Sequence, residues 1–575
     1  MTDILSGALT GEFDLRTGKI NGIPTSTILD GTIAAAFAGV LLNGDELRAS
    51  LKAGQEASPA EVCARLYAQD GLPGLAKLNG PFILALADAR KDSPQLLLVR
   101  DHHGQMGLYY ALDGQRVRFS AELPTLKDCA QGIDSAALAD YLGLGYVPAP
   151  FTIWKGIAKV PASCAVQFQQ GSIPKTATYW TPAYLPKQKL TFEEAVEETR
   201  RLVNQSVQRC LAQIPDAGAL LSGGIDSNVM LGLSHARNAF TIGFEQTDYD
   251  ERALAALSAR KHNAQHFTKL GTAEDAALLT ELQKVSGEPF ADSSLVATAL
   301  AMRLAAEHGT AALTGDGGDE LFGGYRRYQL MAARDRFGEA LTKSFASLAS
   351  LLTHCLPAAT DQRSRMANLQ RLANALNQAP VPCYASFQGI FPAQMLQKLA
   401  PALAPQSTYL AEWQKIYDES SDLEMFERVN YLDLRHYLPD DGCRKATLAE
   451  TGTGLTVLAP LLDMDVTRFA LSLPSQFRIT LRERKRMLRA IGQDLLPPEL
   501  LTQTKRGFGV PVSAWLRGPL APQMRSLYQE QASWDTEGWF EPAVLKQLVE
   551  SHIAGQADHS SRLWCLHCLR LWKQG

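Results

Sequence analysis

Two different patterns of hydrophobic and polar positions divide the chain. Up to about residue 182, the apolar positions form short β-like runs, for example at residues 81–88, 95–99 and 116–119. Asp113-Gly114 and Gln170-Gly171 separate such runs, and both pairs are typical of tight turns between antiparallel strands. The first part of the chain is therefore predicted to be rich in β-strands.

From Thr191 onwards, long helical stretches alternate with short apolar runs. Thr191 and Glu194 form a capping box before a helix that extends towards Leu211. Strand-like runs follow at residues 218–221, 240–244 and 310–314. Strands that alternate with helices are typical of a parallel sheet covered by helices. We therefore predict an α/β fold class, with a β-rich first domain joined to the second through residues 182–190.

Length and composition fit two domains, because the chain has 575 residues of which 46% are apolar and 20% charged. Residues 329–430 are rich in Ala and Leu and are expected to be helical. The 56 basic and 60 acidic residues are mixed, so no dense positive region is present and we expect no nucleic-acid partner. Residues 33–42 are apolar but far shorter than a membrane span, and no basic segment precedes them. We expect no membrane partner and a cytoplasmic location, with the nine cysteines as reduced thiols.

The strongest local signal is Leu220-Leu-Ser-Gly-Gly-Ile-Asp-Ser227, an apolar strand end followed by two glycines and a helical stretch. Glycines let the backbone approach a ligand closely, and the N–H groups that open a helix face an anion. A carboxylate among phosphate donors favours a Mg²⁺ ligand, which is the role expected for Asp226. The residues expected to hold the phosphates are Ser222, Gly223, Gly224 and Ser227. The alternative is a glycine turn capped by Asp226.

A second loop has similar character, Leu313-Thr-Gly-Asp-Gly-Gly-Asp-Glu-Leu-Phe-Gly-Gly-Tyr325. Its carboxylates Asp316, Asp319 and Glu320 are candidates for a second metal ligand and a base. The alternative is a solvated acidic loop or a calcium site, but the loop lacks the later glutamate of an EF-hand.

Together, these two loops resemble those of the asparagine synthetases, whose synthetase domain carries an ATP-pyrophosphatase loop. The resemblance covers nearly the whole chain. In the second part it includes Thr241-Ile-Gly-Phe-Glu245, Tyr249-Asp-Glu251, Glu288-Pro-Phe290, Tyr437-Leu-Pro-Asp-Asp441, Ala459-Pro-Leu-Leu-Asp463 and Lys505-Arg-Gly-Phe-Gly-Val-Pro511. In the first part it includes Leu78-Asn-Gly80, Arg100-Asp101, Leu108-Tyr-Tyr110, Ala121-Glu122 and Tyr141-Leu-Gly-Leu-Gly-Tyr-Val-Pro148.

The resemblance implies two domains of known architecture. Residues 1–185 are expected to form a degenerate glutaminase-like domain of the class II amidotransferase type, with an N-terminal-nucleophile-hydrolase-like sandwich. Residues 190–575 are expected to form an asparagine synthetase-like ATP-pyrophosphatase domain, with an adenine-nucleotide hydrolase-like parallel sheet and many helices.

The resemblance also implies a reaction that uses ATP and Mg²⁺. A substrate carboxylate attacks the α-phosphate of ATP, pyrophosphate leaves, and an amine then attacks the acyl-adenylate. Asp226 and Asp319 match the Mg²⁺ ligands of the family, and Lys445 matches a lysine that stabilises negative charge. Asp316 is expected to relay the proton of the amine. Positions that line the nucleotide are matched by Leu220, Ile242 and Gly315. A surface lysine is the alternative for Lys445.

The first domain departs from glutamine-hydrolysing members of the family. These need an N-terminal cysteine after removal of Met1, whereas position 2 here is Thr2. Threonine is a nucleophile in other hydrolases, so this change alone does not decide the matter. An Asn-Gly-Glu of the glutamine site aligns with Ala38-Gly39-Val40, and a glutamine-binding aspartate aligns with Pro59. Because an apolar site cannot pair the charges of glutamine, we predict that glutamine is not hydrolysed.

The second domain departs from asparagine synthetases after Lys445. Where that family has an Asp-Arg pair, this chain has Thr447 and Leu448, and where the family has a Glu-x-Arg motif, this chain has Thr456 and Leu458. These charges are lost, whereas the carboxylates that match the Mg²⁺ ligands are kept. This combination favours an enzyme that keeps the ATP chemistry of the family but acts on a different substrate. Drift in a loop is the alternative.

Relatives with a degenerate glutaminase domain include β-lactam synthetases and the cyclases that close the isopeptide ring of lasso peptides. We favour the latter, because the region after Lys445 has lost its charges and because Asp316 stands where β-lactam-forming enzymes carry tyrosine. The expected reaction is macrolactam formation in a precursor peptide, with a leader-binding protein and a protease as further partners. An asparagine synthetase using ammonia or glutamine, a β-lactam synthetase-type cyclase and an inactive scaffold remain alternatives.

Two further motifs are expected to be structural. Cys565 and Cys568 stand beside His567 in a Leu/Trp-rich helical pattern without a second ligand pair, which indicates core packing. His102 and His103 are adjacent in a turn, and neighbouring side chains do not easily face one ion.

Overall fold

The computed structural model describes residues 9–22, 26–28, 31–90, 94–338, 344, 372–502 and 509–575. Three regions that the sequence singled out lie outside the described residues. These are Thr2, most of residues 339–371 in the expected helical region, and residues 505–508 at the start of the last family motif.

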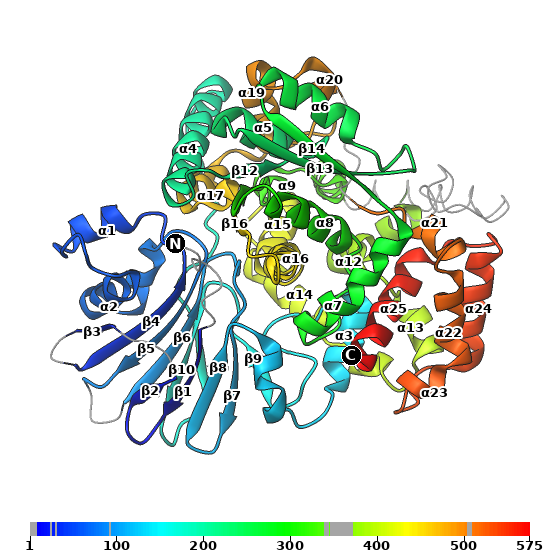
Figure 1. The fold of residues 1–575 in the computed structure, drawn as a ribbon, viewed down its shortest axis with the longest axis horizontal. Helices are drawn as coiled ribbons and strands as arrows, with labels where there is room; N and C mark the ends of the chain where they lie inside the picture. Colours follow the sequence, from blue (N-terminus) through cyan, green and yellow to red (C-terminus); the bar gives the residue numbers. More distant parts are fainter. Residues whose placement is uncertain are drawn as a thin grey trace.

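The N-terminal part of the chain, residues 9–190, contains two antiparallel sheets (Figure 1). The first has the strand order β2-β1-β8-β7-β9 and the second the order β11-β10-β6-β5-β4-β3. The strands of the first sheet are β1 (Thr10–Asp14), β2 (Lys19–Asn21), β7 (Tyr109–Asp113), β8 (Arg116–Ser120) and β9 (Ile157–Lys159). Those of the second are β3 (Ser26–Ile28), β4 (Ile33–Gly39), β5 (Phe82–Asp88), β6 (Gln95–Arg100), β10 (Cys164–Gln169) and β11 (Lys175–Thr178). The predicted β-rich domain and its two hairpins are confirmed.

The second sheet is buried on both faces. Along β5, Ile83 and Ala85 belong to the core between the two sheets, whereas Phe82 and Leu84 face a second core. That second core lies under α1 (Gly44–Ser50) and α2 (Pro59–Asp70). Because side chains alternate between the two faces of a strand, a strand with both faces covered needs a continuous apolar run.

The C-terminal part, residues 192–575, is built on a parallel sheet with the order β14-β13-β12-β15-β16. Its strands are β12 (Gly218–Leu220), β13 (Asn238–Phe244), β14 (Gln265–Gly271), β15 (Ala311–Leu313) and β16 (Thr456–Leu458). The three central strands were predicted, but the edge strands β14 and β16 were not. Between residues 192 and 306, five helices precede or alternate with these strands. They are α4 (Phe192–Gln213), α5 (Ile225–Ser234), α6 (Arg252–Lys261), α7 (Leu278–Ser286) and α8 (Ser294–Ala306). Thr191 and Glu194 form the predicted capping box at the start of α4.

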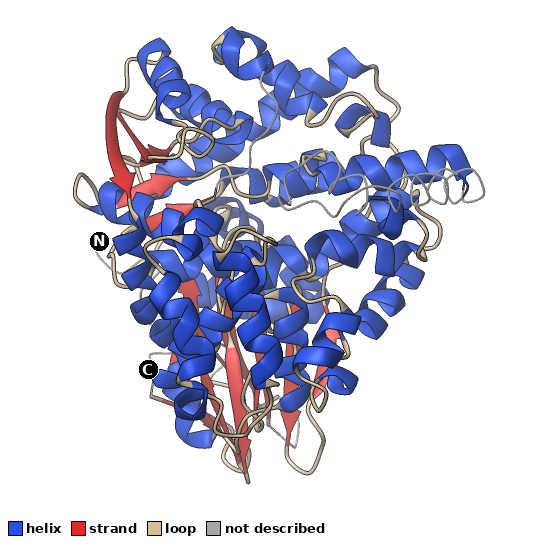
Figure 2. Cartoon of the chain, turned by 90° about the vertical axis from the view of Figure 1, so that its right-hand side faces the viewer, coloured by secondary structure: helices blue, strands red, loops and turns tan. Residues whose placement is uncertain are grey.

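Helices dominate the rest of this part, and they make up most of what Figure 2 shows of this side of the molecule. They include α9 (Gly318–Phe322), α12 (Pro380–Gln388), α13 (Ala393–Leu399), α14 (Tyr409–Glu419), α15 (Met425–Arg435), α16 (Cys443–Glu450), α17 (Met464–Ser472), α19 (Arg486–Leu495), α21 (Val512–Arg517), α22 (Ala521–Gln529), α24 (Pro542–Ile553) and α25 (Ser560–Gln574). Cys565 and Cys568 are buried in α25, as expected for core packing. Within the described residues, no helix combines the length and apolar character needed to cross a bilayer.

The two parts of the chain share a core. No helix or strand lies between Thr178 and Phe192, where we predicted the passage between domains. Helix α3 (Ser135–Leu144), however, precedes this segment and packs into the core of the C-terminal part, and Tyr141 on it donates a hydrogen bond to the Cys565 carbonyl (2.8 Å). The placement of a boundary at residues 185–190 stays a prediction.

Buried polar contacts fix the two parts against each other. Lys159 and Glu288 form an ion pair of 2.6 Å with both side chains about 5% exposed. Asn79 donates to Asp463 (2.8 Å) and accepts from the Met464 N–H (3.0 Å). Since a buried charge is costly without its partner, the relative position of the two parts is well defined.

We expect the substitution Lys159→Met to destabilise the protein by about 3 kcal/mol, because it leaves Glu288 buried without its cation. The measurement is the midpoint of urea denaturation followed by tryptophan fluorescence. The double variant Lys159→Met/Glu288→Leu is the control and should recover much of the loss. A wild-type midpoint for the single variant would contradict this assignment.

Candidate active site

The first loop lies between β12 and α5, at the carboxyl edge of the parallel sheet. Its two serines bind each other, since the Ser222 and Ser227 hydroxyls are 3.0 Å apart and the Ser222 N–H donates to Ser227 Oγ (3.1 Å). The Gly224 N–H donates to Ser222 Oγ (3.1 Å), and the Asn228 amide donates to the Ser222 carbonyl (2.8 Å). The loop is therefore held in one compact form by its own hydroxyl groups.

One backbone donor of this loop is directed at a carboxylate. The Gly223 N–H donates to Glu251 Oε2 (3.0 Å), and Glu251 is the residue immediately before α6. A carboxylate oxygen and a phosphate oxygen accept hydrogen bonds of the same kind. Together with the N-terminus of α5, this arrangement fits the anion-binding role predicted for Ser222, Gly223, Gly224 and Ser227.

The second loop follows β15, the neighbour of β12 in the sheet, and it packs directly against the first. A Cβ atom on Gly315 would lie 2.7 Å from the Ser227 nitrogen, and one on Gly318 would lie 2.6 Å from Cγ of Asp226. Only glycine fits such an approach. These glycines therefore bring Asp226 and Asp319, the two predicted Mg²⁺ ligands, to the same place.

A lysine that the sequence analysis missed joins these two carboxylates. The Lys485 ammonium group forms an ion pair with Asp226 and another with Asp319, at 2.8 Å from Oδ1 of the latter. The Lys485 side chain is 6% exposed and each aspartate is 16% exposed. Burial alone would lower the pKa of Lys485, but the two carboxylates outweigh it and raise the pKa above its usual value.

Lys485 lies in a run of charged residues, Arg482-Glu-Arg-Lys-Arg486, which in a sequence is typical of a solvated surface. Nothing in that run distinguishes the one buried lysine. Its backbone has a φ of +54° immediately before α19, an uncommon conformation for a non-glycine residue. That conformation is visible only in the structure.

The residues present fit a Mg²⁺ ion. Carboxylate oxygens are the ligands that Mg²⁺ prefers, and the ion is usually held by one or two of them together with substrate phosphates. Asp226 and Asp319 converge beside the phosphate loop and remain partly exposed. The donor set and its place beside the first loop carry this assignment.

Lys445 lies in a second charged cluster. It forms an ion pair with Asp292 (3.1 Å) on the loop before α8. Burial would lower its pKa, but Asp292, Tyr437 and Asp441 raise it above the usual value. Burial and the charge of Asp292 in turn raise the pKa of Asp441 to about 8. Three acidic or phenolic groups thus surround one lysine.

The charge of Asp316 also contributes to the raised pKa of Lys445, so these two predicted catalytic residues lie within electrostatic range of each other. The Thr314 hydroxyl donates to Asp316 Oδ2 (2.9 Å) and orients this carboxylate. The structure therefore brings the predicted residues together as two groups, Asp226 with Asp319 and Lys445 with Asp316.

Glu320 lies beside Asp319 and is almost completely buried. Burial and the charge of Asp319 raise the pKa of Glu320 to about 7, and the Tyr325 hydroxyl donates to its Oε1 (2.7 Å). The Arg327 guanidinium stacks on the Tyr325 ring at 3.7 Å and on the Tyr437 ring at 4.8 Å. This arginine connects the side of the site that holds Asp319 with the side that holds Lys445.

The predicted nucleotide-lining positions lie on the same sheet. Leu220 ends β12, and Ile242 lies on the adjacent β13 and is 1% exposed. Gly315 follows β15. All three therefore stand near the carboxyl edge of the sheet, where ligands bind in open α/β folds.

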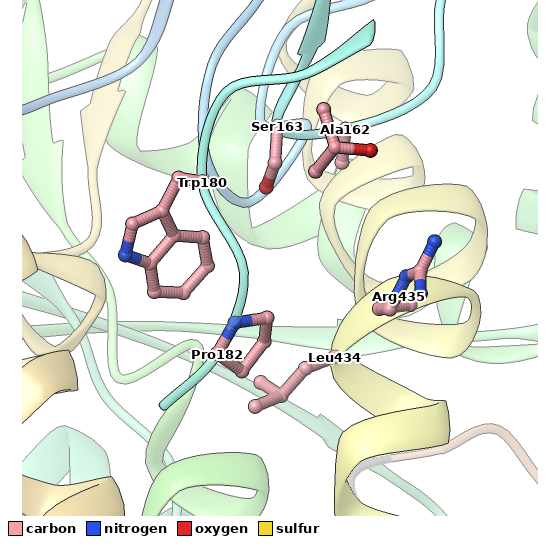
Figure 3. Close-up of a pocket in the computed structure, with 7 residues that line it drawn as sticks. Ala162, Ser163, Trp180, Pro182, Leu434 and Arg435 are labelled. Atoms are coloured by element: carbon pink, nitrogen blue, oxygen red, sulfur yellow. The ribbon is translucent and has the colours of Figure 1, made fainter. Parts of the chain in front are cut away.

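Two cavities lie between the N-terminal and C-terminal parts. One has a volume of about 80 Å³ and is lined by Asp316 and residues of α16. The other, shown in Figure 3, lies between Trp180 and Arg435 and has a volume of about 10 Å³. The second has room for no more than about one water molecule.

The positions that depart from the asparagine synthetase pattern are neutral and mostly structural. Leu448 and Leu458 are each 1% exposed and belong to the large core. The Thr447 hydroxyl donates to the carbonyl of Gln105 in the N-terminal part (2.7 Å). Thr456 begins β16. None of these four positions presents a charge to a substrate.

The positions aligned with a glutamine site are also structural. Ala38 pairs with Ile83 in the second sheet, Gly39 has a φ of +121°, and Val40 is 2% exposed. A Cβ atom on Gly39 would lie 2.2 Å from the Pro81 carbonyl, so no larger residue fits there. Pro59 is the first residue of α2, a position that suits proline.

Comparison with known proteins gives two family matches. Residues 198–574 match the asparagine synthase model, and residues 24–180 match a glutamine amidotransferase domain. A putative glutamine-hydrolysing asparagine synthetase of Mycobacterium bovis is 28% identical over 93% of this chain and 83% of its own. Asparagine synthetase 1 of Bacillus subtilis is 26% identical, covering 96% and 87%. Amidase chry2 of Gibberella zeae is 21% identical, covering 82% and 75%.

We expect Asp319→Asn to weaken MgATP binding at least about tenfold, because the substitution removes a charged ligand, and a hydrogen bond to a charged group is worth about 1.5–3 kcal/mol. Isothermal titration calorimetry with MgATP is the measurement. Asp216→Asn, at an exposed position before β12, is the matched control. Equal affinities for both variants would show that Asp319 does not contact the metal–nucleotide complex.

Proposed function

The chain belongs to the asparagine synthase family and is an ATP-dependent carbon–nitrogen ligase that forms AMP, and from this premise we propose that it closes an isopeptide bond within a precursor peptide. A side-chain carboxylate of the peptide is adenylated, and an amine of the same peptide attacks it. The products are a macrolactam, AMP and pyrophosphate.

Each group of the site has a part in this reaction. The first loop and the N-terminus of α5 hold the phosphates of ATP through Ser222, Ser227 and the glycine N–H groups. Asp226 and Asp319 would hold Mg²⁺, which when bound would neutralise charge on the pyrophosphate. Lys485 adds a positive charge at the same point.

The second charged cluster, which contains Lys445 and Asp292, acts at the carbonyl group that the amine attacks. Lys445 places a positive charge where the carbonyl oxygen becomes negative, and Asp292 holds this lysine in position. Asp316 accepts a proton from the attacking amine. In this proposal, the charges around Asp226 and Asp319 serve the leaving pyrophosphate, and those around Lys445 serve the new amide.

The observation that carries the choice of a peptide substrate is the loss of charge after Lys445. Free aspartate has an α-ammonium and an α-carboxylate that need charged partners, because burying an unpaired charge is costly. Thr447, Leu448 and Leu458 supply none, and the two leucines are part of the core. A carboxylate within a peptide lacks these two charged neighbours.

The second candidate is an asparagine synthetase acting on free aspartate. It is favoured by the relatives of Mycobacterium bovis and Bacillus subtilis, which carry that name and match over more than nine-tenths of this chain. Both candidates use the same ATP chemistry and differ only in the carboxylate and the amine.

Pyrophosphate release distinguishes the two. We expect release with ATP, Mg²⁺ and synthetic peptides that carry a free N-terminal amine and one internal aspartate or glutamate at varied positions. We expect none above background with L-aspartate and ammonium chloride. Lys485→Met is the control that should abolish release with peptides, because it removes the charge beside pyrophosphate. Release with aspartate and ammonium alone would identify an asparagine synthetase.

We also propose that the N-terminal part does not hydrolyse glutamine, because Ala38, Gly39, Val40 and Pro59 offer no charged group to it. When incubated with L-glutamine, the unaltered protein should release glutamate no faster than its Thr2→Ala variant does. Coupled glutamate dehydrogenase detects the product. Glutamate release that disappears in Thr2→Ala would refute this prediction.

A further inference from the structure

Three arginines, Arg326, Arg484 and Arg489, gather where the second loop meets the start of α19. Arg484 immediately precedes Lys485, and its guanidinium donates a hydrogen bond to the Gly324 carbonyl (2.9 Å). Arg326 follows Gly324 closely in the chain. The Nε–H of Arg489, on α19, donates to the Arg484 carbonyl (3.0 Å). Backbone contacts thus bring the three guanidinium groups together, and we call them the arginine cluster.

Ion pairs do not neutralise the positive charges of this cluster. Within the described residues, Lys485 and Arg486 of the same charged run pair with carboxylates, whereas the arginines of the cluster pair with none. The side-chain hydrogen bonds that Arg484 and Arg489 donate go to backbone carbonyls. A guanidinium group does not lose its proton in proteins, so the cluster keeps all of its positive charge.

The charges of the cluster repel one another. Burial and the nearby charges of Arg326 and Arg489 lower the pKa of Arg484. The negative charge of Asp319 opposes this effect and offsets only part of it. Such repulsion is relieved when an anion lies among the cations, which is typical of anion-binding sites.

The exposure of the basic groups increases away from the metal site. The Lys485 side chain is 6% exposed beside the two metal carboxylates. Arg484 and Arg489 are half-buried, and Arg326 is exposed to solvent. Since the charge of Asp319 acts on Arg484, the cluster adjoins the metal side of the site. A ligand that contacts the cluster and the metal carboxylates therefore extends from the metal site towards solvent.

A pyrophosphate group has the chemistry and the position that this cluster requires. The proposed reaction leaves pyrophosphate at the metal site, and both of its phosphates carry negative charge. Planar guanidinium groups match the oxygens of a phosphate and bind them through paired hydrogen bonds. The first loop and the metal carboxylates are assigned to one part of this group, and the arginine cluster lies where the remaining phosphate would extend.

We propose that Arg326, Arg484 and Arg489 bind the outer phosphate of a polyphosphate group. That phosphate is the γ-phosphate in ATP and one of the two phosphates in free pyrophosphate. The inference rests on the pyrophosphate release of the proposed function, and it holds equally for a peptide and for free aspartate as the substrate. Binding at the cluster is non-covalent, so no bond forms or breaks there. The cluster extends the phosphate site from the first loop to the molecular surface.

Isothermal titration calorimetry of the full-length protein tests this assignment with Mg²⁺-pyrophosphate, MgATP and AMP. The variants are Arg484→Gln and Arg326→Glu, and the second changes an exposed side chain and leaves the core intact. We expect both to weaken pyrophosphate binding at least about tenfold, because a hydrogen bond between charged groups is lost. AMP lacks the outer phosphates, so its affinity should not change. If Arg484→Gln does not fold, Arg326→Glu decides alone.

Arg486→Gln is the matched control. This arginine stands in the same charged run, but its guanidinium pairs with Glu483 and lies over the Phe192 ring of α4 at 4.6 Å. The control should bind pyrophosphate as the unaltered protein does. Arg484→Lys keeps the charge but not the forked donors, so it should recover part of the affinity that Arg484→Gln loses.

The ligands separate the two sources of the phosphate. Weaker binding of both MgATP and pyrophosphate supports a contact with the γ-phosphate of bound nucleotide, and weaker binding of pyrophosphate alone supports a contact made after cleavage. Unchanged pyrophosphate affinity in both variants would overturn the inference, as would an equal loss of AMP affinity. Binding needs neither a carboxylate nor an amine substrate. These results are therefore independent of pyrophosphate release with peptides, whose absence would instead contradict the proposed function.

Discussion

The site depends on one arrangement of charges, in which the Lys485 ammonium group lies between the carboxylates of Asp226 and Asp319. Two carboxylates so close together repel each other unless a cation lies between them. Lys485 supplies that cation here, and a Mg²⁺ ion held by the same two carboxylates would supply further positive charge. This arrangement joins the first loop, the second loop and the start of α19 at one point.

Glycine makes the arrangement sterically feasible. The two loops follow neighbouring parallel strands, so they emerge side by side at one edge of the sheet. Gly315 and Gly318 let the second loop contact Asp226, and a Cβ atom on Gly324 would collide with both Asp319 and Lys485. The glycine-rich character of both loops therefore reflects the close packing of three charged side chains as much as the binding of phosphate.

The acidic groups of the site differ in their pKa values, and the difference separates their roles. Burial and neighbouring charge raise the pKa of Glu320 to about 7 and that of Asp441 to about 8, and burial alone raises that of Glu450 to about 8. Asp292 is the opposite case, since Lys445 outweighs its burial and lowers its pKa. Carboxylates that remain ionised suit metal and lysine binding, whereas those that titrate near neutral pH suit proton transfer.

The sequence by itself determined the fold class and located the two glycine-rich loops, in which the phosphate and metal residues are predicted, because these features depend on local patterns. Short apolar runs predicted β5, β6, β8, β12, β13 and β15, and the Thr191–Glu194 capping box predicted the start of α4. Edge strands β14 and β16 escaped prediction, and β14 is largely polar. A strand of this kind is defined by its neighbour in the sheet rather than by its own composition.

Only the tertiary structure decided the position of Lys485 and the cavity beside Asp316. Lys485 is separated from Asp226 by 259 residues and stands in a charged run that resembles a solvated surface. The cavity was likewise not predicted, because residues that line it, such as Asp316 and Met106, come from distant segments and from different parts of the chain. Local sequence carries information on backbone conformation and on chemical type, whereas the burial of a charge and the partner that neutralises it arise only when distant segments pack together.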